Sequence, residues 1–116
     1  MSYDINLVKN YEVSTPLVIE TCKKTALALG GKLLSHDESG KILMIQMDKK
    51  LQGKVLGDRS KLEIRYSSPT AESCQLNILA YPLNVVGQKL MFGARPGVVK
   101  TVLQVFFEQV EGSLKA

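Results

Sequence analysis

Nitrogen and sulfur ligands for a metal are scarce in this chain, which has one histidine and two cysteines. A zinc site needs three or four convergent ligands, and the spacing of Cys22 and Cys74 matches no CxxC, zinc or haem motif. His36 stands beside Asp37 and Glu38, but consecutive residues of an extended segment point to alternating sides. We therefore expect no metal and no cofactor, His36 in an exposed turn, and both cysteines as free thiols in the core, as in a reducing compartment.

Signatures of nucleophilic catalysis are also missing. The sequence contains no GxSxG elbow, and a Cys–His pair would require His36 to meet a cysteine that we expect to be buried. A carboxylate pair for general acid–base chemistry remains an alternative. Glu63, however, lies between Lys61 and Arg65, a pattern typical of a solvated charge array across strands. The sequence thus predicts a protein that is not an enzyme and has no catalytic residues.

The sequence also has no long hydrophobic run. No stretch approaches the roughly 18 to 20 continuous apolar residues that a membrane span needs. The first residues, MSYDINLVKNYEV, do not combine a basic segment with an uninterrupted apolar one, as a signal peptide would. We expect no transmembrane segment and a cytoplasmic location.

The composition is that of one ordinary globular domain over residues 1–116. Hydrophobic residues make up 45% of the chain and charged residues 22%, which is enough apolar material for a core. Apolar alternation predicts strands, and apolar residues at steps of three and four predict helices. Strands are expected over 3–13, on both sides of a turn at 37–40, over 61–66, and from 74 to a stop at Pro82. Helices are expected from Pro16 to Leu29 and from about Pro96 to Gly112.

The segment 49–60 is open at this stage: it could be a long loop, a short strand near 54–56 or a flexible flap. The order of the other elements is β-α-β-β-β-β-α. Strands with one polar face can be covered on one side only. We therefore predict an α+β fold, in which an antiparallel sheet of about five strands has two helices packed on one face.

This order resembles the helix-grip and TATA-binding-protein-like α+β topologies. It is also similar to small bacterial domains with the same order and spacing of elements. The resemblance rests on a first helix ending at LGG (29–31), a hairpin around DESGKI (37–42), and a loop with glycine and basic residues before the last helix. Helix-grip proteins often hold an apolar ligand between the sheet and the long helix. The resemblance therefore implies a binding function.

Surplus apolar residues indicate the same function. We predict a non-catalytic binding domain for a small apolar or amphipathic ligand between the sheet and the C-terminal helix, lined by Met44, Met91, Phe92, Val99, Leu103 and Phe106. Met91 and Phe92 are also expected to cover one end of the core. The alternative is a protein–protein interaction module, in which the same apolar surface forms a homodimer.

A weak anion or phosphate site is the remaining alternative. The net charge is +4, and basic residues gather in the 49–65 region. The candidate residues are Lys49, Lys50, Lys54, Arg59, Arg95 and Gly97. The stretch MFGARPGVVK (91–100) is not a phosphate loop, because its glycines and lysine have the wrong spacing. Because the basic cluster lacks interleaved aromatics for stacking bases, we do not expect nucleic acid as a partner.

Overall fold

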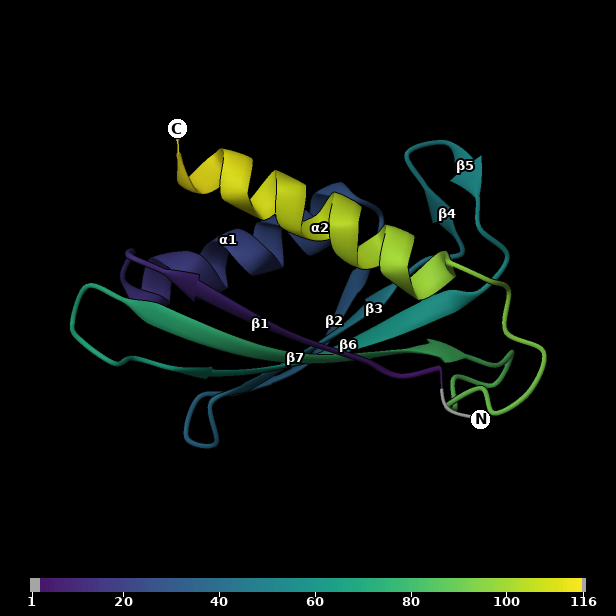
Figure 1. Ribbon diagram of the computed structural model, residues 1–116, viewed down its shortest axis with the longest axis horizontal. Coiled ribbons are helices and arrows are strands. Elements are labelled where there is room, and N and C mark those ends of the chain that lie inside the picture. The colour runs from purple at the N-terminus through teal and green to yellow at the C-terminus, as the bar shows by residue number, and fades with distance from the viewer. Residues whose placement is uncertain (1–2, 116) are drawn as a thin grey trace.

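The structure is a computed structural model that describes residues 3–115 (Figure 1). Within these residues the chain forms two helices and seven strands, six of which lie between the helices. Their order is β1 (Ile5–Tyr11), α1 (Thr15–Ala28), β2 (Lys32–Asp37), β3 (Ile42–Met47), β4 (Lys50–Leu51), β5 (Lys54–Val55), β6 (Arg59–Ser67), β7 (Cys74–Leu83) and α2 (Val98–Leu114).

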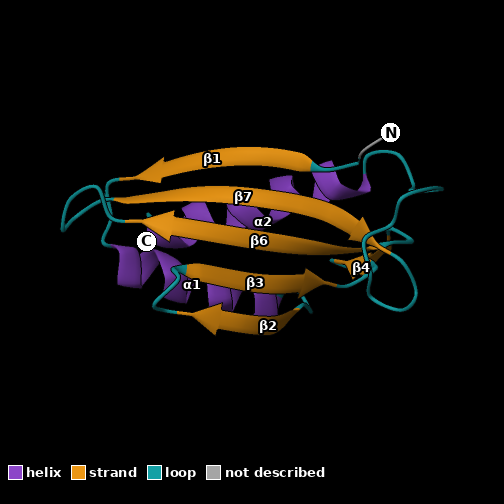
Figure 2. Cartoon of the chain, turned by 90° about the horizontal axis from the view of Figure 1, so that it is seen from below, coloured by secondary structure: helices purple, strands orange, loops and turns teal. Residues whose placement is uncertain are grey.

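Five strands form one antiparallel sheet in the order β1-β7-β6-β3-β2, and β4 and β5 form a separate two-stranded hairpin. Both helices lie on one face of the five-stranded sheet, and no helix of residues 3–115 covers the other face (Figures 1 and 2). The register aligns Leu43 with Ile64 and Ile64 with Ile78, so one row of apolar side chains crosses three strands beneath the helices. The predicted α+β fold is confirmed.

Helix α1 begins at Thr15, one residue before the start that the sequence predicts. Ser14 is its N-cap and Pro16 lies in its first turn, where a missing N–H costs no hydrogen bond. Its buried stripe includes Ile19, Cys22 and Ala26. After the helix, Gly31 passes so close to β3 that a Cβ there would come within 2.8 Å of the Gln46 carbonyl oxygen. Glycine is needed at this position for the helix end to pack on the sheet.

Helix α2 differs from the prediction at both ends. It begins at Val98, because Gly97 adopts a left-handed conformation with φ 76° as the N-cap and leaves Pro96 outside the helix. It also continues through Gly112 to Leu114, whose side chain packs against the core. The apolar stripe therefore extends the helix past a residue with low helix propensity.

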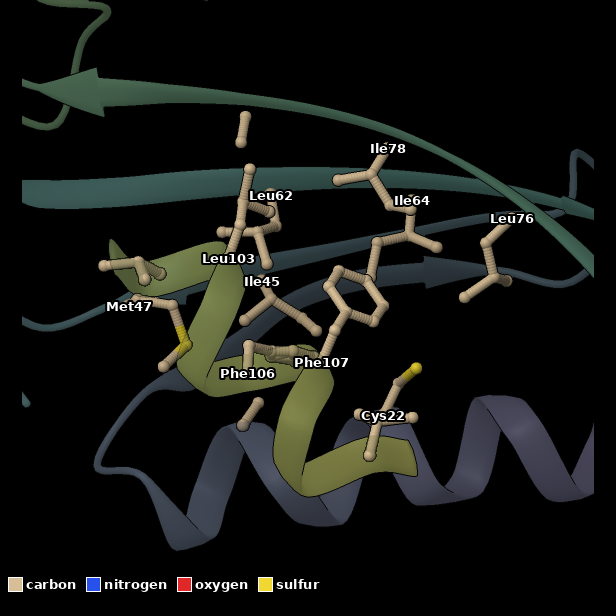
Figure 3. Close-up of a cluster of buried hydrophobic side chains, with 14 of the residues drawn as sticks. Cys22, Ile45, Met47, Leu62, Ile64, Leu76, Ile78, Leu103, Phe106 and Phe107 are labelled. Atoms are coloured by element: carbon tan, nitrogen blue, oxygen red, sulfur yellow. The ribbon is translucent and has the colours of Figure 1, made fainter. Parts of the chain in front are cut away.

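The core lies between the helices and the sheet (Figure 3). Phe106 and Phe107 of α2 stand edge to face with ring centroids 5.0 Å apart. Phe106 is fully buried, as are Ile45 and Ile64 of the sheet. Cys22 and Cys74 are buried free thiols, as predicted.

The segment 49–60, for which the sequence allowed a loop, a short strand or a flap, forms the β4–β5 hairpin. Gln52 and Gly53 both have positive φ and turn the chain from β4 into β5, the geometry of a two-residue hairpin. Pro82, predicted to end its strand, lies inside β7. The pairing of β1 with β7 stops at Ala80, so the missing N–H of Pro82 interrupts no bond to β1.

Candidate functional site

A hollow of about 370 Å³ lies where β1 and β7 meet the start of α2. We call it the α2 hollow. Its lining is largely apolar, with two basic residues, and comprises Tyr3, Ile5, Pro82, Ala94, Arg95, Pro96, Gly97, Val98, Val99 and Lys100. This composition, apolar walls with a few polar groups, is typical of sites for small molecules.

The start of α2 gives the α2 hollow a positive side. No side chain caps the helix, since its N-cap is Gly97, and the first N–H groups of a helix favour a negative ligand. Arg95, two residues before the N-cap, is held by the turn between β5 and β6, since its backbone N–H donates to Asp58 Oδ2 over 2.8 Å. Its side chain lies against Gly57, where any Cβ would collide with the guanidinium. The residues flanking the hollow are therefore held by both the helix and the β5–β6 turn.

The structure separates the six residues predicted to line a ligand site. Val99 lines the α2 hollow, whereas Leu103 and Phe106 belong to the packed core. Met44 alternates with the buried Leu43 and Ile45 and so lies on the sheet face away from the helices.

Met91 and Phe92 are in the segment between β7 and α2, with exposed fractions of 55% and 85%. The expectation that they cover the core is wrong. Backbone bonds fold the start of this segment back on the end of β7, since Leu90 N–H donates to the Pro82 carbonyl and Asn84 N–H to the Gln88 carbonyl.

The residues predicted to bind anions are brought to one end of the molecule. Lys49 and Arg59 line a second hollow of about 290 Å³ together with Asn84 and Gly93. Lys50 and Lys54 are exposed on the β4–β5 hairpin beside it. Arg95, in the connection between β7 and α2, is bonded to Asp58 in the turn between β5 and β6. Gly97 lines the α2 hollow instead.

His36 lies in β2 and is half-buried, so the predicted exposed turn is wrong for this residue. Its Nε2 is 2.7 Å from the hydroxyl of Tyr66, which reaches it from β6 on the helix side of the sheet. Both line a third hollow of about 380 Å³ together with Glu20 and Lys23 of α1. Burial, and then the charges of Glu38 and Asp37, raise the pKa of Tyr66. The phenol, which is protonated at neutral pH, can donate to the imidazole nitrogen or accept from it.

Sequence reasoning missed most of the α2 hollow. Tyr3, Ile5 and Pro82 come from distant segments and meet there only through the pairing of β1 with β7, in which Ile5 lies opposite Ala80. The sequence predicts Ala94 in the loop before the last helix and Pro96 at the start of that helix, and it assigns neither residue to a site. The one available signal was the run of Arg95, Pro96 and Gly97 directly before an apolar helix.

Across residues 3–115, no three His, Cys, Asp or Glu side chains gather closely enough to hold a metal ion. No helix within the same residues combines the length and apolar character needed to cross a membrane. No protein-family model matches the chain, and no curated protein matches its sequence.

Proposed function

We propose that the protein is a non-catalytic binding domain for a small amphipathic ligand with an anionic head group. The observation that carries the proposal is the α2 hollow, in which apolar walls end at the uncapped start of α2 beside Arg95 and Lys100. A volume of about 370 Å³ falls in the lower part of the range for small-molecule sites.

The two halves of such a ligand would meet different chemistry. Ile5, Val98 and Val99 offer an apolar wall for a hydrocarbon chain, and burying that chain is the main source of affinity. The N–H groups at the start of α2 and the Arg95 guanidinium favour a carboxylate or phosphate over a neutral head group.

Octanoate is a suitable probe, with octanol as the neutral comparison. We expect octanoate at millimolar concentration to raise the Tm of the protein and to bind with a Kd of roughly 0.1–1 mM, as suits a ligand of about ten heavy atoms. Octanol should bind several-fold more weakly. No shift in Tm and no heat of binding in calorimetry with octanoate would exclude the proposal.

Two variants locate the binding. Ala94→Phe places a ring at the α2 hollow and should abolish octanoate binding, whereas Ala28→Phe makes the same change at the exposed end of α1 and should leave it intact. Lys100→Glu should weaken octanoate more than octanol, with Lys24→Glu as the matched control. Equal effects of Ala94→Phe and Ala28→Phe would place the ligand elsewhere.

A further inference from the structure

Two neighbouring segments form one end of the molecule, the right-hand end in Figure 1. Residues 48–61 comprise the β4–β5 hairpin and the start of β6. Residues 84–100 comprise the connection from β7 to α2 and the first three residues of that helix. We call the two segments together the loop end. They are tied to each other by the hydrogen bond from Arg95 N–H to Asp58 and by the packing of the Arg95 side chain on Gly57. Side chains on the two segments are therefore presented together.

The loop end exposes large apolar side chains to an unusual degree. Over residues 3–115, the four most exposed large hydrophobic residues all belong to it: Val85 at 87%, Phe92 at 85%, Val86 at 73% and Val55 at 70%. Single exposed apolar residues are normal on a soluble protein, but a concentration of them at one end marks an interaction surface.

The geometry of the 84–88 turn holds two of these side chains outward. Asn84 Oδ1 accepts hydrogen bonds from the backbone N–H groups of Val86 and Gln88, at 3.0 and 2.9 Å. Gly87, with φ 85°, completes the turn. Val85 and Val86 are thus fixed at the tip of an ordered turn, and their exposure is a property of the fold.

Positive charge is concentrated in the same place. Of the fifteen basic and eleven acidic residues of the chain, the loop end holds eight basic residues and only two acidic ones, Asp48 and Asp58. It therefore carries a net charge of +6, and the rest of the chain carries −2 with seven basic and nine acidic residues. Asp58 is itself occupied by the Arg95 backbone. One acidic residue from outside the two segments, Asp4, pairs with Lys89, which leaves seven basic residues of the loop end outside this ion pair.

We propose that the loop end docks on an anionic lipid bilayer, with the exposed apolar tips entering the head-group region and the surrounding lysines and arginines contacting lipid phosphates. A fluid bilayer accepts apolar tips and basic side chains at once, and its affinity grows with both buried apolar area and basic charge.

Charge and apolar tips together favour a bilayer over other anionic partners. A nucleic acid would meet the positive charge but offers no place for three valines, and Phe92 is the loop end's single aromatic residue for stacking on a base. The apolar tips stand on separate turns, which a deformable surface can accommodate without a matching groove.

The absence of tryptophan from the chain provides a direct test. Phe92→Trp places a single fluorophore at an 85% exposed position. On addition of vesicles of phosphatidylcholine and phosphatidylserine, its emission should shift to the blue and become shielded from iodide. Leu27→Trp, at a 58% exposed position on α1, should report no change. An unshifted Phe92→Trp in the presence of these vesicles at low salt would overturn the proposal.

Vesicle co-sedimentation of the full chain supplies the affinities. Binding should require phosphatidylserine and fall as salt is added. Val85→Ser with Phe92→Ser should reduce binding at least roughly tenfold, since it removes inserted apolar area, whereas Leu17→Ser with Leu27→Ser should not. Lys50→Glu with Lys54→Glu should reduce binding to a similar degree, with Lys24→Glu and Lys32→Glu as the matched pair.

Three outcomes would overturn the docking proposal. The first is an equal loss of vesicle affinity in a test pair and its control pair. The second is binding to pure phosphatidylcholine vesicles that is as strong as binding to vesicles with phosphatidylserine. The third is a preference for an oligonucleotide over vesicles that persists in the Val85→Ser, Phe92→Ser double variant. Neither Val85 nor Phe92 lines the α2 hollow, so octanoate binding should persist in that double variant. Failure of docking and failure of the proposed ligand binding can thus be told apart.

Discussion

Tyr11 of β1 donates a hydrogen bond from its hydroxyl to Glu111 Oε2 of α2 over 2.7 Å. Lys9 Nζ lies 3.0 Å from the same carboxylate oxygen. These contacts fasten the edge strand of the sheet to the last turns of α2. We expect Tyr11→Phe, which removes one of them, to lower the free energy of unfolding by about 1 kcal/mol, as loss of a partly exposed hydrogen bond does. Urea denaturation at pH 7 measures this difference.

The difference between wild type and Tyr11→Phe should depend on pH in both directions. Burial acts to raise the pKa of Glu111, but hydrogen bonds from Tyr11 and Lys9 and the charges of Lys9 and Lys115 outweigh it and hold that pKa below 4.5. The stabilisation is therefore present above pH 4.5 and is lost as the pH falls through the lower, folded-state value.

At alkaline pH the stability difference between wild type and Tyr11→Phe falls as the pH rises, the opposite of its behaviour at acid pH. Burial, and then the bond to the Glu111 carboxylate, raise the pKa of Tyr11 above its ordinary value of 10.0. The unfolded chain ionises first as pH rises past 10, so the wild type loses stability relative to Tyr11→Phe. A difference that stays constant from pH 3 to pH 11 would show that the bond contributes nothing.

Phe106 and Phe92 are a matched pair for testing the core. Phe106 is fully buried, whereas Phe92 is 85% exposed. Phe106→Ala should cost about 3–5 kcal/mol of unfolding free energy, because it removes buried area and leaves a cavity. Phe92→Ala should change stability by less than about 0.5 kcal/mol. Chemical denaturation of both variants, analysed with the same dependence of unfolding free energy on denaturant, measures the two losses of stability. Comparable losses would place Phe92 in the core.

Two glycines at opposite ends of α2 should respond oppositely to alanine. Gly97 has φ 76° and free space around it, so Gly97→Ala suffers backbone strain alone and should destabilise by about 1–2 kcal/mol. Gly112 lies inside the helix, also with free space, and Gly112→Ala should stabilise by about 0.5–1 kcal/mol. Thermal unfolding of the two variants should move Tm in opposite directions, and a shared direction would contradict the assigned start of α2.

Cys22 should be almost inert in the folded protein. Burial, and then the proximity of Cys74, raise its pKa from 9.0 to about 12, which reduces the thiolate fraction at pH 8 by about a thousandfold or somewhat less. We expect alkylation by iodoacetamide to follow global unfolding, with rates that rise steeply in urea. Labelling at the rate of a free peptide thiol without denaturant would show that the site opens locally.

Much of the fold could be predicted because periodicity reports burial directly. The alternation of Leu62 and Ile64 with Lys61 and Glu63 placed β6 with one covered face, and the structure confirms it. Periodicity does not say which face of a strand meets the helices when both are apolar. Met44 was therefore expected near α2 although it lies on the opposite side of the sheet.

The candidate site was harder to predict because it depends on backbone conformation and on distant contacts. Apolar character alone suggested that Phe92 would be buried, but Phe92 is exposed, in a segment whose start folds back on the end of β7 through the turn at Asn84. Likewise, Ile5 and Pro82 meet only once the register of β1 on β7 is known. The absence of catalysis and the cytoplasmic location stay predictions, and the homodimer stays an alternative.

The uneven distribution of charge along the chain has a kinetic consequence. A loop end of +6 and a remainder of −2 shift the centre of positive charge toward the loop end, even with Asp4 paired to Lys89 there. This gives the molecule a permanent electric dipole, in a body 42 Å long. Near any negatively charged surface this dipole experiences a torque within about one Debye length, roughly 8 Å at physiological salt. The protein would be turned before it makes contact, so that more encounters begin in one orientation and association becomes faster as salt is lowered.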